Sequence, residues 1–511
     1  MLIFKQGDFP REMSNYTLVK KRLTILLWLA IFVCLLPFLL LPFLNSMAGD
    51  DYQFYDLYRV HGFWGTQEFI YHGWAGRYTT TFLNGSFVTL DILHRYYWMP
   101  CLLLFGCTWG ALFFLLSTLH GLLPGRPFGR ARIAQASFLF LILFLYVQAE
   151  IATGFYWFSS AIVYQPSFIL SVVFAACLVR RLSVAGSKQS LDVLILLLIV
   201  LIVGCNEMAA VFLLLFLVAL IGYWHYGRRP VPSYLWLYAG VALAICLIVA
   251  STSGVLWGRR RLMNGSTSYL KILPIVFFQF AAVFFSVFKE PLFWFSCVAG
   301  FLFGMRVARD SAGIGPLFIF REKRVLLAGL VLLPVLVFLC LAIMLVGSRG
   351  SLPPRALNNL TDWLAGGLLL LSFCAGIRKG SAVPAPGALG LPPVLLTGVL
   401  VLLLFASVNY RDAWKTVLSG YFYHAVAVDR DRHLTAAGRR HDGVAIVPAY
   451  AEAVEDKIHQ VFPHGIFESV NSLLLERPPL FYYYDGAAGK DRAYRLYYGL
   501  DSIIIGRQKI R

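Results

Sequence analysis

The sequence predicts a polytopic α-helical membrane protein, and three observations carry this prediction. Hydrophobic residues make up 59% of the 511 residues and charged residues only 14%, whereas soluble domains carry roughly 25% charged residues. The mean hydropathy is +0.71. Several apolar runs, such as LTILLWLAIFVCLLPFLLLPFL at 23–44, contain no charge, and a run of about 20 such residues crosses a bilayer as a helix.

We expect about eleven membrane spans from runs of this kind. They lie at 23–44, 98–122, 133–149, 160–179, 191–204, 208–225, 234–251, 290–306, 325–347, 359–377 and 391–408. The first run is too long for a signal-peptide core, so we interpret it as a span that is kept. Residues 269–289 are also apolar enough to cross. Counting them would place the basic cluster at 306–324 outside, so an interfacial or re-entrant helix is favoured there.

The basic residues orient these spans. Lys20, Lys21 and Arg22 precede the first span, and the loops after alternate spans are rich in arginine and lysine. Because cytoplasmic loops carry the excess of positive charge, we expect a cytoplasmic amino terminus and a periplasmic carboxyl terminus. The same bias accounts for the net charge of +18. No soluble module with a clustered basic face is apparent, which argues against nucleic acid as a partner.

The domain boundaries follow from the spans. Residues 1–408 are predicted to form the transmembrane domain, with a long first periplasmic loop at 45–97, and residues 409–511 a small periplasmic domain of α/β or α+β type. Within this domain, DGVAIVPAY (442–450) is typical of a strand that ends in a turn. Its tyrosines either bind a glycan or pack onto the membrane domain, and packing is favoured. They are Tyr482, Tyr483, Tyr484, Tyr497 and Tyr498.

Acidic residues gather where spans meet the outer surface. Asp50 and Asp51 follow the first span in SMAGDDYQFYD (46–56), and Glu150 lies at the outer end of the third span. The break GCNEMAA (204–210) brings Asn206 and Glu207 to the same level. A carboxylate at a membrane edge can cap a neighbouring helix, but such groups are costly to bury and are therefore candidates for function.

Aromatic residues and arginines occur at the same depth. The segment YHGWAGRYTTTFLNGSF (71–87) and the loop at 150–164 supply the aromatic residues, while WGRRRLM (257–263) and PPRAL (353–357) supply arginines. The residues are Trp74, Arg77, Tyr78, Tyr156, Trp157, Tyr164, Arg259, Arg260, Arg261 and Arg355. Singly, each fits an interfacial aromatic belt or headgroup contact. Together they favour a site where a sugar stacks on aromatic rings and a phosphate pairs with arginine.

Such a set of side chains suits glycosyl transfer at the membrane surface. A carboxylate would deprotonate the acceptor hydroxyl, and arginines or a metal ion would hold the leaving phosphate. Asp50 and Asp51 could share a divalent cation through their oxygens, or one could act as the base and the other orient it. The nine cysteines all lie in or beside apolar runs and have no metal-ligand spacing. The sequence thus favours no obligatory cofactor.

At this point the chain resembles a known group of enzymes. The stretches GDDY (49–52), GWAGRY (73–78), EIATGFYWFSSAIVY (150–164), CNE (205–207) and PPR (353–355) are similar to those of the GT-C superfamily of polyprenyl-phosphate-sugar-dependent glycosyltransferases, bacterial members that modify O-antigen in particular. The resemblance implies a GT-C-like fold in a bacterial inner membrane, with a first-loop aspartate, Asp51 or Asp50, as the base.

The resemblance also implies the partners. The donor would be a hexose, aminoarabinose or arabinofuranose on a polyprenyl phosphate, and the acceptor a surface polysaccharide such as lipopolysaccharide, another lipid or a pilin. Two other functions stay open. A flippase or transporter would place its polar groups near the bilayer midplane. An O-antigen polymerase or ligase would share the arginines and the topology, but it has less need of the aspartate pair.

Overall fold

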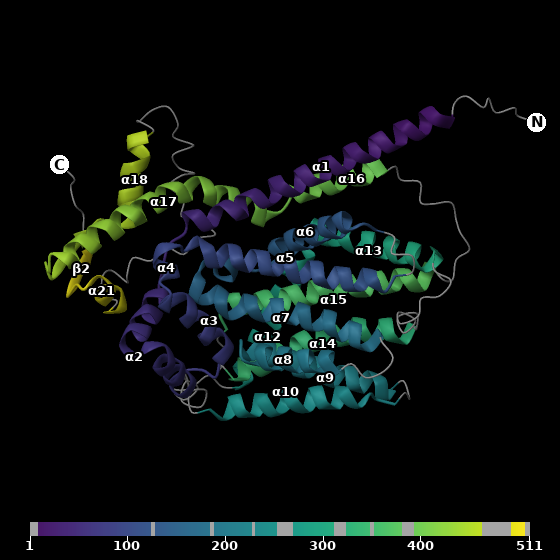
Figure 1. Ribbon diagram of the computed structural model, residues 1–511, viewed down its shortest axis with the longest axis horizontal. Coiled ribbons are helices and arrows are strands. Elements are labelled where there is room, and N and C mark those ends of the chain that lie inside the picture. Colours follow the sequence, from purple (N-terminus) through teal and green to yellow (C-terminus); the bar gives the residue numbers. More distant parts are fainter. Residues whose placement is uncertain are drawn as a thin grey trace, which may run out of the picture.

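The computed structural model of the protein describes residues 9–123, 128–183, 189–226, 230–252, 269–310, 323–347, 352–380, 393–461 and 492–505. In this part of the chain nearly every element is a helix, and most helices run side by side along the long axis of the molecule (Figure 1). The apolar runs account for this, because a helix satisfies its backbone N–H and C=O groups within one segment.

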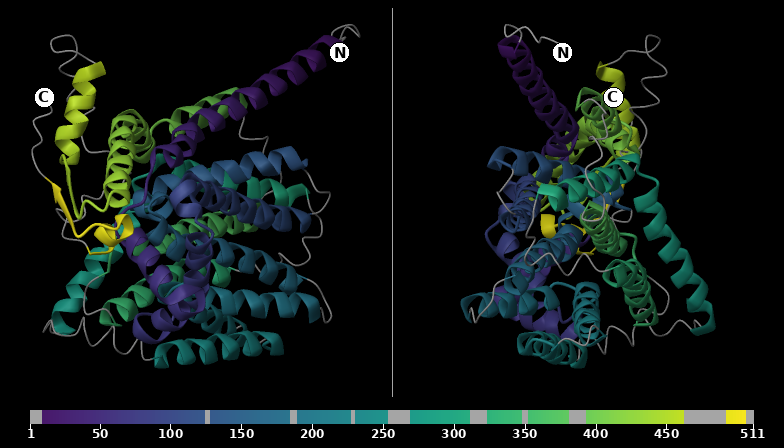
Figure 2. Two further views of the ribbon diagram at one scale, coloured as in Figure 1. Left: turned by 60° about the vertical axis from the view of Figure 1, so that its left-hand side comes forward. Right: turned by 90° about the vertical axis from the view of Figure 1, so that its right-hand side faces the viewer.

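Ten helices in the described ranges are long and apolar enough to cross a membrane. They are α1 (Phe9–Leu44), α5 (Trp98–Gly121), α6 (Arg130–Val147), α7 (Phe158–Ser183), α9 (Glu207–Tyr226), α10 (Ser233–Ser251), α12 (Tyr269–Phe288), α13 (Pro291–Asp310), α14 (Lys323–Gly347) and α15 (Arg355–Gly380). The apolar part of α1 is Lys21–Leu44, and the amino-terminal half of this helix projects away from the bundle (Figures 1 and 2). The prediction of a polytopic helical membrane protein is confirmed.

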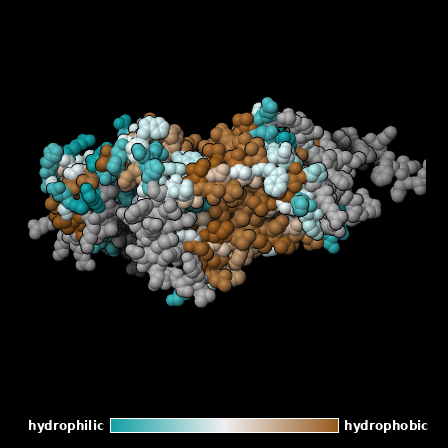
Figure 3. Space-filling view, turned by 90° about the horizontal axis from the view of Figure 1, so that it is seen from below, coloured by the Kyte–Doolittle hydropathy of each residue, from teal (hydrophilic) through white to brown (hydrophobic). Residues whose placement is uncertain are grey.

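The surface of the bundle fits the same conclusion. Figure 3 shows one face, on which a broad band of apolar side chains covers the middle and polar side chains gather toward the ends. On α10 the exposed side chains include Trp236, Leu243 and Leu247. A water-soluble protein rarely exposes an apolar area of this extent, whereas the hydrocarbon of a bilayer covers it at no cost.

Two of the predicted spans differ from the helices observed. The segment predicted at 191–204 forms α8 (Gln189–Val203), which has only 15 residues. Such a helix is about 22 Å long, whereas the hydrocarbon core of a bilayer is about 30 Å thick. The segment predicted at 391–408 ends at a break. There α16 (Pro393–Leu404) meets α17 (Val408–Arg439) at an angle of 52°. Counted as one span, this bent pair brings the candidates in the described ranges to eleven.

Residues 269–289, for which an interfacial or re-entrant helix was favoured, contain α12. Its stretch Lys271–Phe288 has the length and hydropathy of a membrane span. The helix packs against both α14 and α15, and the rings of Phe277 and Phe280 both contact the Phe338 ring, with centroids 5.2 and 5.4 Å away. An interfacial position for α12 stays a prediction.

The predicted loop at 45–97 is a cap of three helices. These are α2 (Asp50–Gly73), α3 (Tyr78–Thr89) and α4 (Ile92–Arg95). Helix α2 turns back on itself at Gly62, whose φ of 66° suits a residue without a side chain. The hydroxyl of Thr66 fastens this turn by donating to the carbonyls of Leu57 and Gly62, at 3.0 and 2.8 Å. We call the end of the bundle that carries α2, α3 and α4 the first-loop end.

The carboxyl-terminal elements lie at this same end (Figure 1). Helix α17 leads to β1 (Val444–Val447), α18 (Tyr450–Val461), α21 (Arg492–Tyr498) and β2 (Ser502–Ile505), and the two strands pair in parallel with Val444 opposite Ser502. The strand predicted within 442–450 is confirmed. Tyr52 of α2 packs against Tyr494, Tyr497 and Tyr498, with ring centroids 4.8, 5.1 and 6.4 Å away. Tyr482, Tyr483 and Tyr484 lie outside the described residues.

Small residues allow a close contact between α13 and α15. A methyl group on Gly376 would overlap the carbonyl oxygen of Phe301, and one on Gly304 would overlap the carbonyl oxygen of Phe373. Small residues allow two backbones to approach inside a membrane, where packing and not water exclusion drives association. The pair holds α15, which carries the polar residues described next, against the rest of the bundle.

Candidate functional site

Asp51 lies at the centre of the contacts at the first-loop end. Its side chain is 0% exposed. One carboxylate oxygen accepts from the Ala48 N–H at 2.9 Å and the Tyr97 hydroxyl at 2.8 Å, and the other accepts from the Ser159 N–H at 2.9 Å and the Ser159 hydroxyl. Burial raises the pKa of Asp51 to about 6, against the lowering effect of these bonds. The carboxylate therefore joins α2, α5 and α7, and no lone pair is left for an outside molecule.

Asp50 has a different environment. It is partly exposed and opens the first turn of α2, where the helix dipole favours a negative charge. The preceding Gly49 has a φ of 51°, so the chain turns sharply just before the two aspartates. The fold therefore buries one aspartate of the adjacent pair and leaves the other partly exposed.

Trp157 and Arg355 complete this region. The Trp157 indole N–H donates to the Ala48 carbonyl at 3.0 Å, and the Arg355 guanidinium lies over the Trp157 ring at 5.0 Å from its centroid. Arg355 is partly exposed. Tyr156, in contrast, is almost fully buried and donates its hydroxyl to the Phe38 carbonyl at 2.9 Å. Its geometry is that of a packing residue beneath the site and gives no surface for substrate.

The middle of the first-loop end is a layer of amides and hydroxyls. Asn358 accepts from the Glu150 N–H at 3.0 Å and donates to the Glu150 carbonyl at 2.7 Å, which leaves the Glu150 carboxylate partly exposed. Asn359 donates to the Ser167 hydroxyl at 2.6 Å and to the Tyr164 carbonyl at 3.2 Å. These bonds fix α6, α7 and α15 relative to one another at the first-loop end.

Asn206 and Glu207 differ in burial and in the partners that they bind. Asn206 is buried, donates to the Ser167 hydroxyl at 2.9 Å and accepts from the Ala209 N–H at 2.8 Å at the start of α9. Glu207 forms a forked ion pair with Arg77, with contacts of 2.8 to 3.1 Å and side chains 26% and 32% exposed. Burial lowers the pKa of Arg77, but the Glu207 charge outweighs it, so that the pKa is raised.

The break at 204–206 receives the start of α3. The Thr79 N–H donates to the Gly204 carbonyl at 3.0 Å, and the Thr80 hydroxyl donates to the Cys205 carbonyl at 3.0 Å. A methyl group on Gly204 would overlap the Tyr78 ring. The predicted break between two apolar runs is thus confirmed, and its carbonyl groups orient Arg77 and Tyr78 through the first turn of α3.

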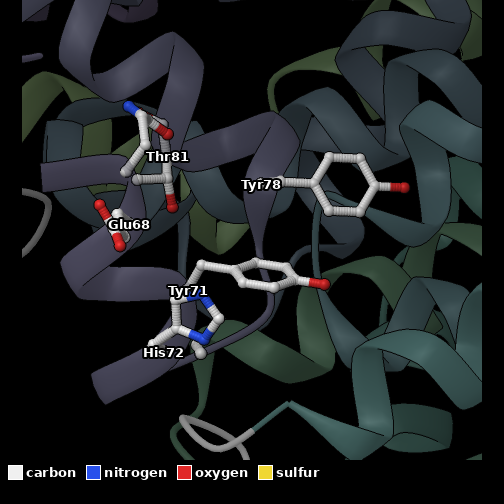
Figure 4. Close-up of a pocket in the computed structure, with 7 residues that line it drawn as sticks. Glu68, Tyr71, His72, Tyr78 and Thr81 are labelled. Carbon is white, nitrogen blue, oxygen red and sulfur yellow. The ribbon is translucent and has the colours of Figure 1, made fainter. Parts of the chain in front are cut away.

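A hollow of about 340 Å³ lies between α2 and α3. It is lined by Gln67, Glu68, Tyr71, His72, Ala75, Tyr78 and Thr81. Figure 4 shows the Tyr71 and Tyr78 rings extending in the same direction, with Glu68 and His72 one turn apart on α2. Trp74 is 65% exposed and takes no part in the lining.

The structure therefore gathers most of the residues singled out from the sequence into one layer at the first-loop end. Arg259 and Arg260 lie outside the described residues, as does Arg261. Where the structure is described, no three His, Cys, Asp or Glu side chains come together as metal ligands. A cation shared by Asp50 and Asp51 would have to displace hydrogen-bond donors from Asp51, so these residues fit that ion poorly.

Sequence reasoning missed four polar residues of this layer, Gln148, Asn358, Asn359 and Asp362. All four are buried. The signal was present, because RALNNLTDW (355–363) places two amides and a carboxylate within an apolar helix, and such groups inside a membrane mark function or a specific contact. The predicted span began at 359, which separated Asn358 from the residues that follow it.

Comparison with models of protein families, with curated protein sequences and with solved structures finds no match to this chain. The functional interpretation consequently depends on the geometry and chemistry of the first-loop end.

Proposed function

We propose that the protein is an integral-membrane glycosyltransferase that moves a sugar from a polyprenyl-phosphate donor to an acceptor at the periplasmic face of a bacterial inner membrane. One observation carries the proposal. Ala48 binds Asp51 through its N–H and Trp157 through its carbonyl. Through these two bonds Ala48 connects the start of α2, where Asp50 is partly exposed, with the Trp157 ring, over which the partly exposed Arg355 guanidinium lies.

The assignment of the base follows from exposure. A general base has to come within hydrogen-bond reach of the proton that it removes. The Asp51 carboxylate is fully enclosed by donors, whereas Asp50 is partly exposed. We therefore assign the base to Asp50 and give Asp51 the task of fixing the start of α2. This reverses the order of preference that the resemblance implied.

The reaction is a single displacement. Asp50 takes the proton of an acceptor hydroxyl, whose oxygen forms a bond to the anomeric carbon of the sugar. The bond from that carbon to the phosphate oxygen breaks, and the polyprenyl phosphate leaves with the electron pair. Arg355 pairs with the phosphate as its charge grows. Because a single bond is formed as another breaks, the anomeric configuration is inverted.

The hollow between α2 and α3 fits an acceptor that carries hydroxyl groups. Its two tyrosine rings offer apolar faces, and Gln67, Glu68 and His72 offer hydrogen-bonding groups at its rim. Carbohydrates present the same combination of apolar faces and hydroxyl edges. The volume of about 340 Å³ is at the lower end of the range of small-molecule sites, which favours recognition of one terminal unit of a glycan or lipid acceptor.

The experiment is a transfer assay on the purified full chain in lipid nanodiscs. A panel of polyprenyl-phosphate sugars and membrane-extracted acceptors is supplied, and the acceptor is analysed by mass spectrometry. Arg355→Lys keeps the charge but loses the planar guanidinium, so transfer should fall at least about tenfold. Arg440→Lys, an exposed arginine whose pair is with Asp442, is the matched control and should leave transfer unchanged.

The other two functions predict different products in the same assay. A flippase would move the lipid-linked sugar across a liposome bilayer without modifying an acceptor. A polymerase or ligase would transfer a lipid-linked oligosaccharide as a block and leave single sugars unused. Either product, obtained without single-sugar transfer from any donor of the panel, would refute the proposal.

A further inference from the structure

Asp362 is a carboxylate that the proposed reaction does not use. It lies within the membrane-spanning stretch of α15, two helical turns after Arg355, and is 1% exposed. The Gln148 side-chain N–H donates to one Asp362 oxygen at 3.1 Å, and Gln148 is also 1% exposed. The second Asp362 oxygen and the Gln148 side-chain oxygen have no hydrogen-bond partner in the described part of the chain.

No cation compensates this carboxylate among the described residues. Within the described ranges, the side chain that interacts with it is Gln148. Two ionisable residues close in sequence to Asp362 and Gln148 have other contacts: Arg355 lies over Trp157, and the Glu150 backbone is bonded to Asn358. On α7, the carbonyl of Tyr164 accepts from the neighbouring Asn359. An ionised Asp362 would thus be a buried and unpaired charge inside a membrane, which is among the most costly arrangements in proteins.

The two unpaired oxygens lie on the same two side chains that are already joined by a hydrogen bond. In the ionised form both oxygens are acceptors, so neither can satisfy the other. One proton on the free Asp362 oxygen turns it into a donor, and its natural acceptor is the Gln148 oxygen. A carboxylic acid and a primary amide then form a ring closed by two hydrogen bonds. A single proton removes the buried charge and both unsatisfied oxygens together.

We propose that Asp362 is a proton-binding site, occupied at neutral pH, and that the protonated acid pairs with Gln148 as a cyclic acid–amide brace. This inference is independent of the glycosyltransferase proposal. The Asp362–Gln148 pair is in close contact with the segment around Gly154. A methyl group on Gly154 would come within 2.8 Å of the Asn358 side-chain nitrogen and 3.0 Å of the Gln148 oxygen. The π-helical turn η1 (Ala152–Tyr156) is therefore packed directly on the brace.

The consequence is that the bound proton positions the segment that leads to Trp157. The brace ties the end of α6 to α15, and the Asn358 bonds to the Glu150 backbone continue the same connection. Loss of the proton would restore the charge and set two acceptor oxygens against each other. A sodium ion is the other ligand that unpaired oxygens could bind. The brace itself offers only two free oxygens, and hard cations take six or more oxygen ligands, so a proton fits better.

Infrared difference spectroscopy tests the proposal at neutral pH on the full chain in nanodiscs. Subtracting the Asp362→Asn spectrum from that of the unmodified protein should leave the carbonyl band of a protonated carboxylic acid. The matched control, Asp56→Asn, removes a partly exposed carboxylate that is paired with Arg59, and its difference spectrum should contain only carboxylate bands. A carboxylate band in the Asp362 difference would overturn the proposal.

Thermal unfolding gives a second test. Asparagine at 362 forms the same two-bond ring with Gln148 and carries no charge, so the unfolding midpoint of Asp362→Asn should equal that of the unmodified protein. Asp362→Leu leaves both groups of the Gln148 amide unpaired and should lower the midpoint. A midpoint of the unmodified protein that rises with sodium, and does not rise for Asp362→Asn, would assign the site to a cation and overturn the proposal.

Discussion

The Asp51 carboxylate should make folding stability depend on pH in a direction opposite to that of most acidic residues. Burial raises its pKa in the folded protein from 3.8 to about 6. The folded state consequently binds a proton more readily than the unfolded state between these two values. The stabilising effect of this protonation is complete below pH 3.8 and is lost as the pH rises through 6.

The size of the effect follows from the pKa. One pKa unit corresponds to about 1.4 kcal/mol. At pH 8 Asp51 is ionised in both states, whereas at about pH 5 it is mostly protonated in the folded state and ionised in the unfolded state. The unfolding free energy contributed by Asp51 should therefore rise by about 1.4 kcal/mol between pH 8 and pH 5. Asp51→Asn, which cannot titrate, should lack this increment.

The assay compares the two proteins in detergent by SDS titration at both pH values. The difference between the unmodified protein and Asp51→Asn cancels the titration of every other group that the two share. Tyr97→Phe, which removes one donor from Asp51 and keeps the carboxylate, serves as the control and should retain a pH-dependent difference from Asp51→Asn. An identical difference at pH 8 and pH 5 would refute the burial of an ionisable Asp51.

Three further substitutions test the packing of the first-loop end. Gly204→Ala should lower the unfolding free energy by about 1–3 kcal/mol, because the new methyl group overlaps the Tyr78 ring; an unchanged SDS midpoint would contradict this packing. Arg77→Lys should destabilise by about 1–2 kcal/mol, since lysine cannot form the forked pair with Glu207, and 1 M salt should not abolish the difference. Gly376→Leu should separate α13 from α15 and prevent detergent extraction of a monodisperse protein, whereas an unchanged gel-filtration profile would refute the close contact.

The membrane spans could be predicted from the sequence because each span has to supply, by itself, enough apolar residues to cross the hydrocarbon. A run of apolar residues either is or is not long enough to cross. The break at 204–206 was predictable for the same reason, since Asn206 and Glu207 interrupt two apolar runs. The shortness of α8 and the bend between α16 and α17 were not predicted, because the positions at which a helix ends depend on its neighbours.

The difference in burial between Asp50 and Asp51 could not be predicted from the sequence. The side chains that enclose Asp51 come from Tyr97 and Ser159, which are 46 and 108 residues away. Hydropathy and composition contain no information on such pairings. The same holds for Asp362, whose partner Gln148 is 214 residues distant. For a polar residue at a membrane edge, the sequence predicts a structural or functional role. The tertiary contacts decide whether the residue stabilises the fold or takes part in the reaction.

The most direct test of the proposed function is sugar transfer by Asp50→Asn in nanodiscs, with the donor and acceptor that the unmodified protein uses. Asparagine keeps the size of the side chain and cannot accept a proton. Transfer should fall by about 10²-fold or more, while the SDS midpoint should fall only slightly, because neutralising a charge at a helix amino terminus costs about 0.3–1 kcal/mol. Asp56→Asn, on the same helix, should transfer normally. Undiminished transfer by Asp50→Asn would contradict the assignment of the base, and no transfer by the unmodified protein with any donor of the panel would contradict the function itself.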